Sequence, residues 1–156
     1  MTERLYQRSN FGAAIFYKNP LAALEWLERA FGFERSMLIT NPDGSLAHAE
    51  MTVGDGYITV GSEWAAYTAS PESTGGKNTQ ILHVHLEEGI ETHCVRARAA
   101  GAAIVRELSD EFYGDRVYSA RDPEGHVWTF AQTARVVSRA EAEAASGLTI
   151  DSPAWK

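Results

Sequence analysis

The chain has 156 residues, of which 44% are apolar and 22% charged, and its formal net charge is −7. This composition is typical of a soluble globular unit and excludes a disordered or fibrous class. The acidic balance disfavours a nucleic-acid partner, which needs clustered Lys and Arg. No run of about 18 to 20 apolar residues predicts a membrane span. MTERLYQRSN lacks the apolar core of a signal peptide, so we expect a cytoplasmic protein with no membrane partner.

Cys94 is the only cysteine in the chain. An intrachain disulfide and a thiolate metal cluster within one chain are therefore excluded. Free cysteines are usually buried packing groups, so we expect packing for Cys94, with catalysis as the alternative.

The first half of the chain predicts four strands and one helix. The apolar segment 11–17 is typical of a buried strand. Asn19 as a cap and Pro20 as the first helical residue predict a helix that ends at Gly32. The remaining strands of this half are predicted over 34–40, 46–53 and 57–63, separated by turn sequences rich in Gly, Asn and Asp. The order is therefore β-α-β-β-β.

The second half repeats this order after a linker. Residues 69–77 are rich in Ser, Gly, Pro and Thr, which is typical of an exposed loop. A strand is then predicted over 81–86 and a helix over 90–100, with Gly101 as its cap. The last three strands are predicted over 103–108, 116–120 and 127–132. The sequence is thus a tandem of two modules of one type.

Glycine positions indicate that the two modules are in register. The glycines after the helices, Gly32 and Gly101, are 69 residues apart, and so are those of the last hairpins, Gly56 and Gly125. Beyond the second module, residues 138–141 have the spacing of a capping box and predict a short helix that Gly147 ends. The apolar segment after that helix is expected to pack on the core or on a partner chain.

This tandem, with NPLAALEWLERAFGF after the first strand and DPEGHVWTF at the end, resembles the vicinal oxygen chelate superfamily, which includes glyoxalase I, bleomycin-resistance proteins and extradiol dioxygenases. The resemblance implies an α+β fold in which modules 11–66 and 80–133 form a curved, incomplete barrel around a cleft. It implies a domain over 1–133, followed by a helical tail over 134–156. It also implies a homodimer whose clefts draw on both chains.

Metal-dependent members of that superfamily carry His or Glu on the first and fourth strands of each module. The glyoxalase I pattern puts the four ligand positions of this chain at Gly12, Val60, Ile81 and Thr129. A slip of one residue puts them at Ala13, Gly61, Leu82 and Phe130. Neither set is a plausible ligand set, so the resemblance implies a member without a metal cofactor.

Four polar residues define the alternative, a divalent-metal site of unusual composition. His83 and His85 are two apart on one predicted strand and project from the same face, and His48 and Glu50 have the same spacing on another. If these strands meet across the cleft, the four side chains can bind Zn²⁺ or Fe²⁺. We favour neutral histidines that hydrogen-bond a ligand. The other two histidines are expected at the surface or in a turn: His93 and His126.

Aromatic residues are plentiful near predicted strand ends and in loops that border such a cleft, and planar ligands stack on such rings. Together with the histidine pair they give the predicted ligand-binding residues: Trp64, Tyr67, His83, His85, Tyr113, Tyr118 and Trp128. The alternative for each aromatic is core packing. Arg116 and Arg121 either pair with an anionic ligand or are neutralised by Asp115 and Asp122 at the surface.

The expected function is metal-free binding of a planar or aromatic small molecule by a homodimer, as in bleomycin-resistance proteins, with antibiotic sequestration as one form. The alternative is a metal-dependent lyase, isomerase or dioxygenase that uses the displaced His/Glu site. A third interpretation is a purely structural dimer whose own side chains fill the cleft.

Overall fold

Two modules with the same order of elements build the protein. The computed structural model describes residues 2–156. The first module contains β1 (Gly12–Tyr17), α1 (Pro20–Phe31), β2 (Glu34–Thr40), β3 (Leu46–Val53) and β4 (Gly56–Ser62). The second contains β5 (Leu82–His85), α2 (Ile90–Ala99), β6 (Ala103–Asp110), β7 (Asp115–Arg121) and β8 (Val127–Thr133). A 3-10 helix, η1 (Pro71–Thr74), lies in the linker, and α3 (Arg139–Ser146) follows the second module. The predicted α+β fold and its order of elements are confirmed.

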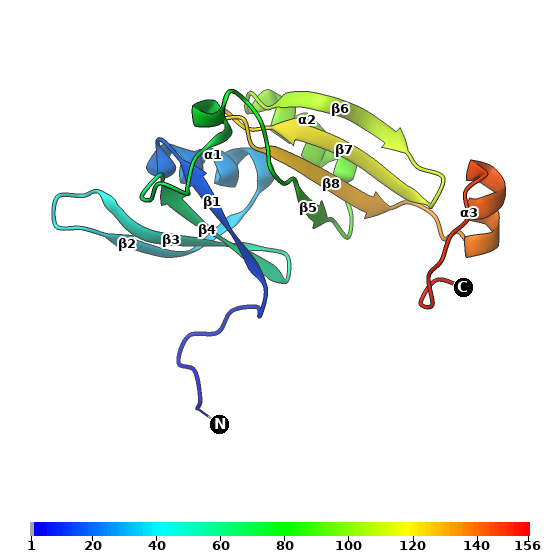
Figure 1. Ribbon diagram of the computed structural model, residues 1–156, viewed down its shortest axis with the longest axis horizontal. Coiled ribbons are helices and arrows are strands. Elements are labelled where there is room, and N and C mark those ends of the chain that lie inside the picture. The colour runs from blue at the N-terminus through cyan, green and yellow to red at the C-terminus, as the bar shows by residue number, and fades with distance from the viewer. Residues whose placement is uncertain (1) are drawn as a thin grey trace.

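Each module forms one four-stranded mixed sheet. The strand orders are β1-β4-β3-β2 and β5-β8-β7-β6, with the first strand parallel to the last and the other pairs antiparallel. Figure 1 shows the two sheets side by side, with α1 and α2 together behind them. Residues 2–156 form no closed barrel. None of the helices in this part of the chain has the length and apolar composition that a membrane span requires.

The core lies between the two helices and the sheets. Alternate residues of β1 and β8 point into it, among them Tyr17, Trp128 and Phe130, and they pack with Leu24 and Leu27 of α1. This apolar cluster is continuous across both modules. We call the opposite face of the sheets, away from α1 and α2, the open face.

Module 2 holds both ends of α1. At the start of the helix, the Glu124 carboxylate accepts hydrogen bonds from the backbone amides of Lys18 and Asn19, at 2.6 and 3.0 Å. At its end, the Arg96 guanidinium donates to carbonyl oxygens of Glu28 and Arg29. A negative group at the N-terminus and a positive group at the C-terminus complement the helix dipole. The two modules are therefore coupled through the backbone of α1.

Two histidines predicted to lie at the surface or in a turn instead connect the modules. The His93 ring donates from Nε2 to the Phe31 carbonyl at 3.0 Å, and its Nδ1 accepts from the Tyr118 hydroxyl at 2.5 Å. His126 is in the predicted turn, but its Nε2 donates to the Phe16 carbonyl at 2.7 Å. Both rings are partly buried. Spacing along one strand or helix does not reveal contacts across the module boundary, so the sequence missed them.

A buried hydrogen-bond network joins the modules on the core side of the sheets. Asp122, at the β7–β8 hairpin, accepts from the Tyr17 hydroxyl at 2.7 Å and from the Trp128 indole N–H at 3.2 Å. It also accepts from the backbone amides of Glu124 and His126. Burial raises the pKa of Asp122 despite these bonds. Burial and the neighbouring Asp122 raise the pKa of Tyr17, which keeps its hydroxyl a donor.

The strand registers correct one predicted metal position. Ala14 lies opposite Thr59 in the first sheet, and His83 lies opposite Thr129 in the second. The second member of these pairs is thus displaced by 70 residues rather than 69. Val60, the position inferred from the glycine spacing, points into the core. The one-residue difference arises in the last hairpin, and the residue equivalent to Thr129 is Thr59.

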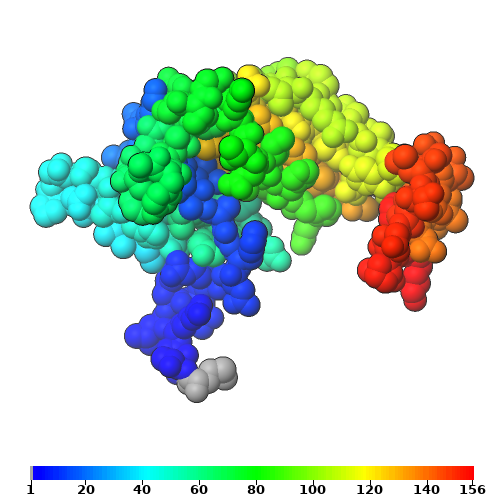
Figure 2. Space-filling model, in the orientation of Figure 1, coloured from blue at the N-terminus to red at the C-terminus, as the bar shows by residue number. Residues whose placement is uncertain are grey.

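The C-terminal tail folds largely on itself. The predicted capping box is confirmed, because Ser138 and Glu141 bond each other's backbone amides. The backbone amide of Arg139 donates to the Lys156 carbonyl, and the Trp155 indole donates to the Val137 carbonyl at 2.8 Å. Figure 1 shows α3 apart from both sheets, beyond the ends of β7 and β8. Figure 2 shows that the tail and the N-terminal arm, residues 2–10, project on the same side of the molecule.

Candidate functional site

Two pairings of glycine with an aromatic residue shape the open face of module 1. Gly12 pairs with Tyr57 and Phe16 pairs with Gly61 across β1 and β4. A Cβ atom built on Gly12 would lie 2.4 Å from the Tyr57 ring, so the ring fits only because this residue has no side chain. A Cβ atom on Gly61 would meet the Phe16 ring at an ordinary 3.8 Å. The Tyr57 ring thus occupies the space that the resemblance assigns to a metal ligand at position 12.

A hollow of about 430 Å³ lies on this face beside the Phe16 ring. Its principal lining residues come from three strands and the segment after β4: Ala14, Phe16, His48, Thr59, Gly61 and Trp64. The Trp64 side chain is 66% exposed, and its ring meets that of Tyr67 edge to face at 5.7 Å. Rings at the wall with a histidine and a hydroxyl beside them suit a planar ligand that carries a few polar atoms.

A carboxylate is buried beside this hollow. Glu50 of β3 is 1% exposed and pairs with Arg8 of the N-terminal arm. It also accepts from Tyr6 at 3.1 Å, and its other oxygen lies 2.9 Å from Nε2 of His48. Burial alone would raise the pKa of Glu50, but the hydrogen bonds from His48 and Tyr6 and the charge of Arg8 lower it below its usual value. The carboxylate is therefore ionised at neutral pH.

The predicted histidine pair lies on the open face of module 2. His83 and His85 are both exposed on β5, as their spacing predicts, and His85 Nε2 lies 3.2 Å from the Thr133 hydroxyl. His48 and Glu50 are likewise on one face of β3. Strands β4 and β1 separate the two pairs within the chain. Among residues 2–156, no three His, Cys, Asp or Glu side chains lie close enough to hold a metal.

The other predicted ligand-binding residues do not join one site. Tyr67 lines a second hollow of about 280 Å³, between the linker and the sheets, together with His126 and Trp128. Tyr118 and Trp128 are core residues, 0% and 1% exposed, which leaves them almost no surface to offer a ligand. They fit the packing alternative. Tyr113 lies in the β6–β7 hairpin, with its ring edge-on to Phe112 at 5.2 Å.

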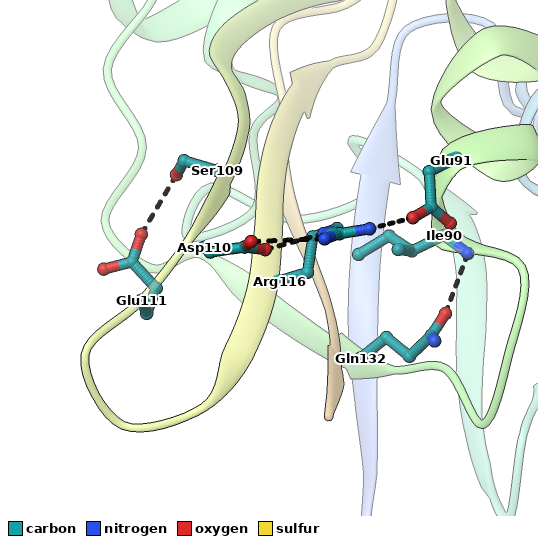
Figure 3. Close-up of polar contacts among 7 residues, drawn as sticks. All are labelled: Ile90, Glu91, Ser109, Asp110, Glu111, Arg116 and Gln132. Carbon is teal, nitrogen blue, oxygen red and sulfur yellow. Dashed lines mark hydrogen bonds and ion pairs between the residues drawn. The ribbon is translucent and has the colours of Figure 1, made fainter. Parts of the chain in front are cut away.

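Arg116 is a structural link at the surface. Figure 3 shows its guanidinium between Asp110 of β6 and Glu91 of α2. The two bonds to Asp110 measure 2.6 and 3.1 Å. Nearby, the Gln132 side chain accepts from the Ile90 amide at 2.9 Å and replaces the side-chain cap that Gly89 cannot supply (Figure 3). Both groups hold the first turn of α2.

The partners expected for the two arginines are corrected accordingly. Arg116 is neutralised, but by Asp110 and Glu91 rather than by Asp115. Arg121 is exposed and forms no ion pair within the part of the chain described. Asp122 is committed to Tyr17 and Trp128. Residue type and proximity in sequence did not identify these partners, since the contacts form between strands and a helix.

Cys94 packs in the core between α2 and the second sheet. It is 6% exposed, and burial raises the pKa of its thiol. A raised pKa keeps the thiol protonated and unreactive at neutral pH. The predicted packing role is confirmed.

The sequence reading missed the N-terminal arm as part of the site. Arg8 and Tyr6 lie in a segment without periodicity, which predicted no contact. A charged residue in the middle of LAHAEMTV was the available signal, because a buried carboxylate requires a cation or hydrogen-bond donors. That signal identifies Glu50 but not its partners.

Comparison with known proteins identifies chains of the same architecture. A family model described as the Glyoxalase/Bleomycin resistance protein/Dioxygenase superfamily matches residues 12–130. An uncharacterized protein of Mycobacterium tuberculosis is 29% identical over 128 residues, which are 80% of this chain and 74% of that protein.

Solved structures are similar over most of the chain. TioX from Micromonospora sp. ML1 matches with a TM-score of 0.66 and 34% identity, over 80% of this chain and 98% of that one. A glyoxalase/bleomycin resistance protein/dioxygenase family enzyme from Burkholderia phytofirmans PsJN matches with a TM-score of 0.60 and 18% identity, over 78% and 96% of the two chains. The second likeness is one of fold alone.

Proposed function

Because this chain belongs to the glyoxalase/bleomycin resistance protein/dioxygenase superfamily, we propose that it binds a planar or aromatic small molecule on the open face of module 1 without a metal cofactor. The observation that carries the proposal is the hollow of about 430 Å³ between the Phe16 and Trp64 side chains. An exposed tryptophan beside a preformed hollow gains buried apolar area when a flat ligand stacks on it.

The donor set favours the metal-free form. The Tyr57 ring fills the space at Gly12, and the register makes the open-face neighbours on β4 Thr59 and Gly61. Hydroxyl groups and glycine are poor substitutes for the His and Glu ligands that hold divalent metals. We derive no chemical step through a metal.

A homodimer is part of the proposal. The open faces of both sheets lack a helical cover, and the arm and tail project on that side of the molecule (Figure 2). Leu38 and Ile39 of β2 and Val105 of β6 are exposed apolar residues that a second copy would cover. Light scattering coupled to size exclusion should give a mass near twice 17.1 kDa.

Calorimetry and tryptophan fluorescence with a panel of planar aromatic antibiotics test the proposed function. Trp26 and Trp128 are buried, so we expect a bound ring to quench mainly Trp64. Trp64→Ala should weaken binding by about tenfold, the equivalent of about 1.4 kcal/mol. Val95→Ala, at an exposed position on α2, is the control that should leave binding unchanged. Failure of every compound to bind contradicts the proposal.

Metal analysis separates the alternative enzyme function. Protein purified without chelator should contain far less than one metal equivalent per two chains, and Zn²⁺, Fe²⁺, Mn²⁺ or Ni²⁺ should not raise its melting temperature, since tight metal binding stabilises the folded state. A stoichiometric metal that His83→Ala removes would instead support the displaced His/Glu site.

A further inference from the structure

We propose that Glu50 and Tyr57 form a cation-binding subsite on the open face, that Arg8 of the N-terminal arm is its built-in occupant, and that the natural ligand carries a guanidinium or ammonium group that displaces Arg8. This inference rests on the proposed function, because it assigns a chemical group to the ligand of the same face.

The arm places a guanidinium in a site with three kinds of recognition. Arg8 pairs with Glu50, and its guanidinium carbon lies 5.5 Å from the centre of the Tyr57 ring and 5.7 Å from that of Tyr6. A cation between two aromatic faces and against a carboxylate gains both cation–π and charge-assisted stabilisation. The strands supply Glu50 and Tyr57, whereas the arm supplies Tyr6 and Arg8.

The sheet part of the site is built independently of the arm. Gly12 leaves the space in which the Tyr57 ring lies across β1, and Glu50 stands on the neighbouring strand β3 with His48 bonded to it at 2.9 Å. An ionised carboxylate that is 1% exposed requires a cation when it is covered. Within the described chain that cation is Arg8, whose own side chain remains 40% exposed. A ligand cation can therefore approach and replace it.

The subsite adjoins the aromatic hollow. Thr59 lies opposite Glu50 and lines the hollow, and His48 contacts both regions. Tyr57 and Gly61 lie on either side of Thr59 along β4, each about 7 Å away at the usual rise of a strand. A ligand with its ring between Phe16 and Trp64 and a cation about one short alkyl chain away would occupy both regions.

The test compares two probes of the same shape, 4-phenylbutylguanidine and the uncharged 4-phenylbutylurea, by calorimetry. Arg8→Ala removes the internal occupant and should raise the affinity for the guanidine by about tenfold or more, with little change for the urea. Arg4→Ala removes an arginine from the same arm and should leave both affinities as in the wild type. Glu50→Gln in the Arg8→Ala background should return the guanidine to the affinity of the urea.

Tyr57→Leu in the Arg8→Ala background keeps an apolar side chain but removes the aromatic face, and it should weaken guanidine binding by about threefold or more. This variant tests the site if Glu50→Gln unfolds, which circular dichroism will show. On addition of the guanidine to the wild type, hydrogen exchange of residues 3–10 should accelerate as the arm is displaced.

The outcomes separate this inference from the proposed function. If Arg8→Ala binds both probes equally, the cation subsite is wrong and the aromatic hollow stands. If only the guanidine binds and its binding needs Glu50, the subsite stands and the aromatic hollow is wrong. If neither probe binds to Arg8→Ala, both proposals are wrong.

Discussion

The Tyr57 ring lies directly over the backbone of Gly12, where a Cβ atom would come within 2.4 Å of it. The pair joins β4 to β1 on the open face and provides the aromatic wall of the subsite that Arg8 occupies. The absence of one side chain thus determines what the neighbouring strand can place there. Glycine at this position removes a ligand position and creates an aromatic surface at the same time.

Gly12→Ala should therefore destabilise the protein by about 1–3 kcal/mol, because an added methyl group must displace the Tyr57 ring or the strand. Urea denaturation measures the loss. Gly61→Ala is the matched control on the same face, where the new atom meets the Phe16 ring at 3.8 Å, and it should change stability by less than about 0.5 kcal/mol. Equal effects of the two substitutions would rule out this account of Gly12.

Tyr17→Phe should cost about 1–3 kcal/mol of unfolding free energy, because it removes one donor from the buried Asp122 carboxylate. Thermal and urea denaturation both report the change. Tyr67→Phe removes a hydroxyl from a residue that is 81% exposed and should leave stability unaltered. A Tyr17→Phe variant as stable as the wild type would show that the bond between the modules contributes nothing.

His93 should make stability depend on pH below neutrality. Burial lowers its pKa from the ordinary value near 6.5, with a smaller lowering by the charge of Arg96, against the bond to the Phe31 carbonyl. The unfolded chain then binds a proton in a range where the folded protein does not, so stability is complete above about pH 6.5 and falls as the pH drops toward the lower, folded-state pKa.

His93→Gln should flatten this part of the pH profile, since a glutamine amide cannot titrate. Denaturation midpoints at pH 7.5, 6.5 and 5.5 measure the difference from the wild type. His83→Gln, at an exposed histidine, is the control that should keep the wild-type slope. Parallel profiles for the wild type and His93→Gln would contradict the role assigned to this ring.

Arg116→Gln should reduce stability slightly and leave ligand binding unchanged. The guanidinium links Asp110 and Glu91 at the surface, where solvent screens ion pairs, so a drop of a few degrees in melting temperature is expected. Calorimetry with any compound that binds the wild type provides the second measurement. A large loss of affinity without a loss of stability would instead assign Arg116 to an anionic ligand.

The order of elements was readable from the sequence because it depends on local chemistry. The cap at Asn19, Pro20 in the first turn and the left-handed Gly32 predict α1 with the bounds it has. The alternation along β3 likewise places His48 and Glu50 on one face. The open-face residues therefore followed from period two alone, once each strand was located.

Contacts between distant segments required the tertiary structure. The spacing of the glycines predicts a repeat of 69 residues, but a one-residue difference in the last hairpin puts Val60 in the core and Thr59 on the open face. A slip of one residue exchanges the two faces of a strand. The same limit applies to Trp128, whose ring faces the core although the sequence allowed either side.

The sequence by itself therefore determined the two-module fold, the unusual residues at the expected metal positions and the same-face pairs on β3 and β5, because these depend on spacing along single elements. Only the tertiary structure decided that the two pairs lie on different sheets, that His93 and Asp122 bind across the modules and that Arg8 covers Glu50. These relationships join residues separated by tens of positions, and the packing of the strands and helices, rather than any local pattern, brings them together.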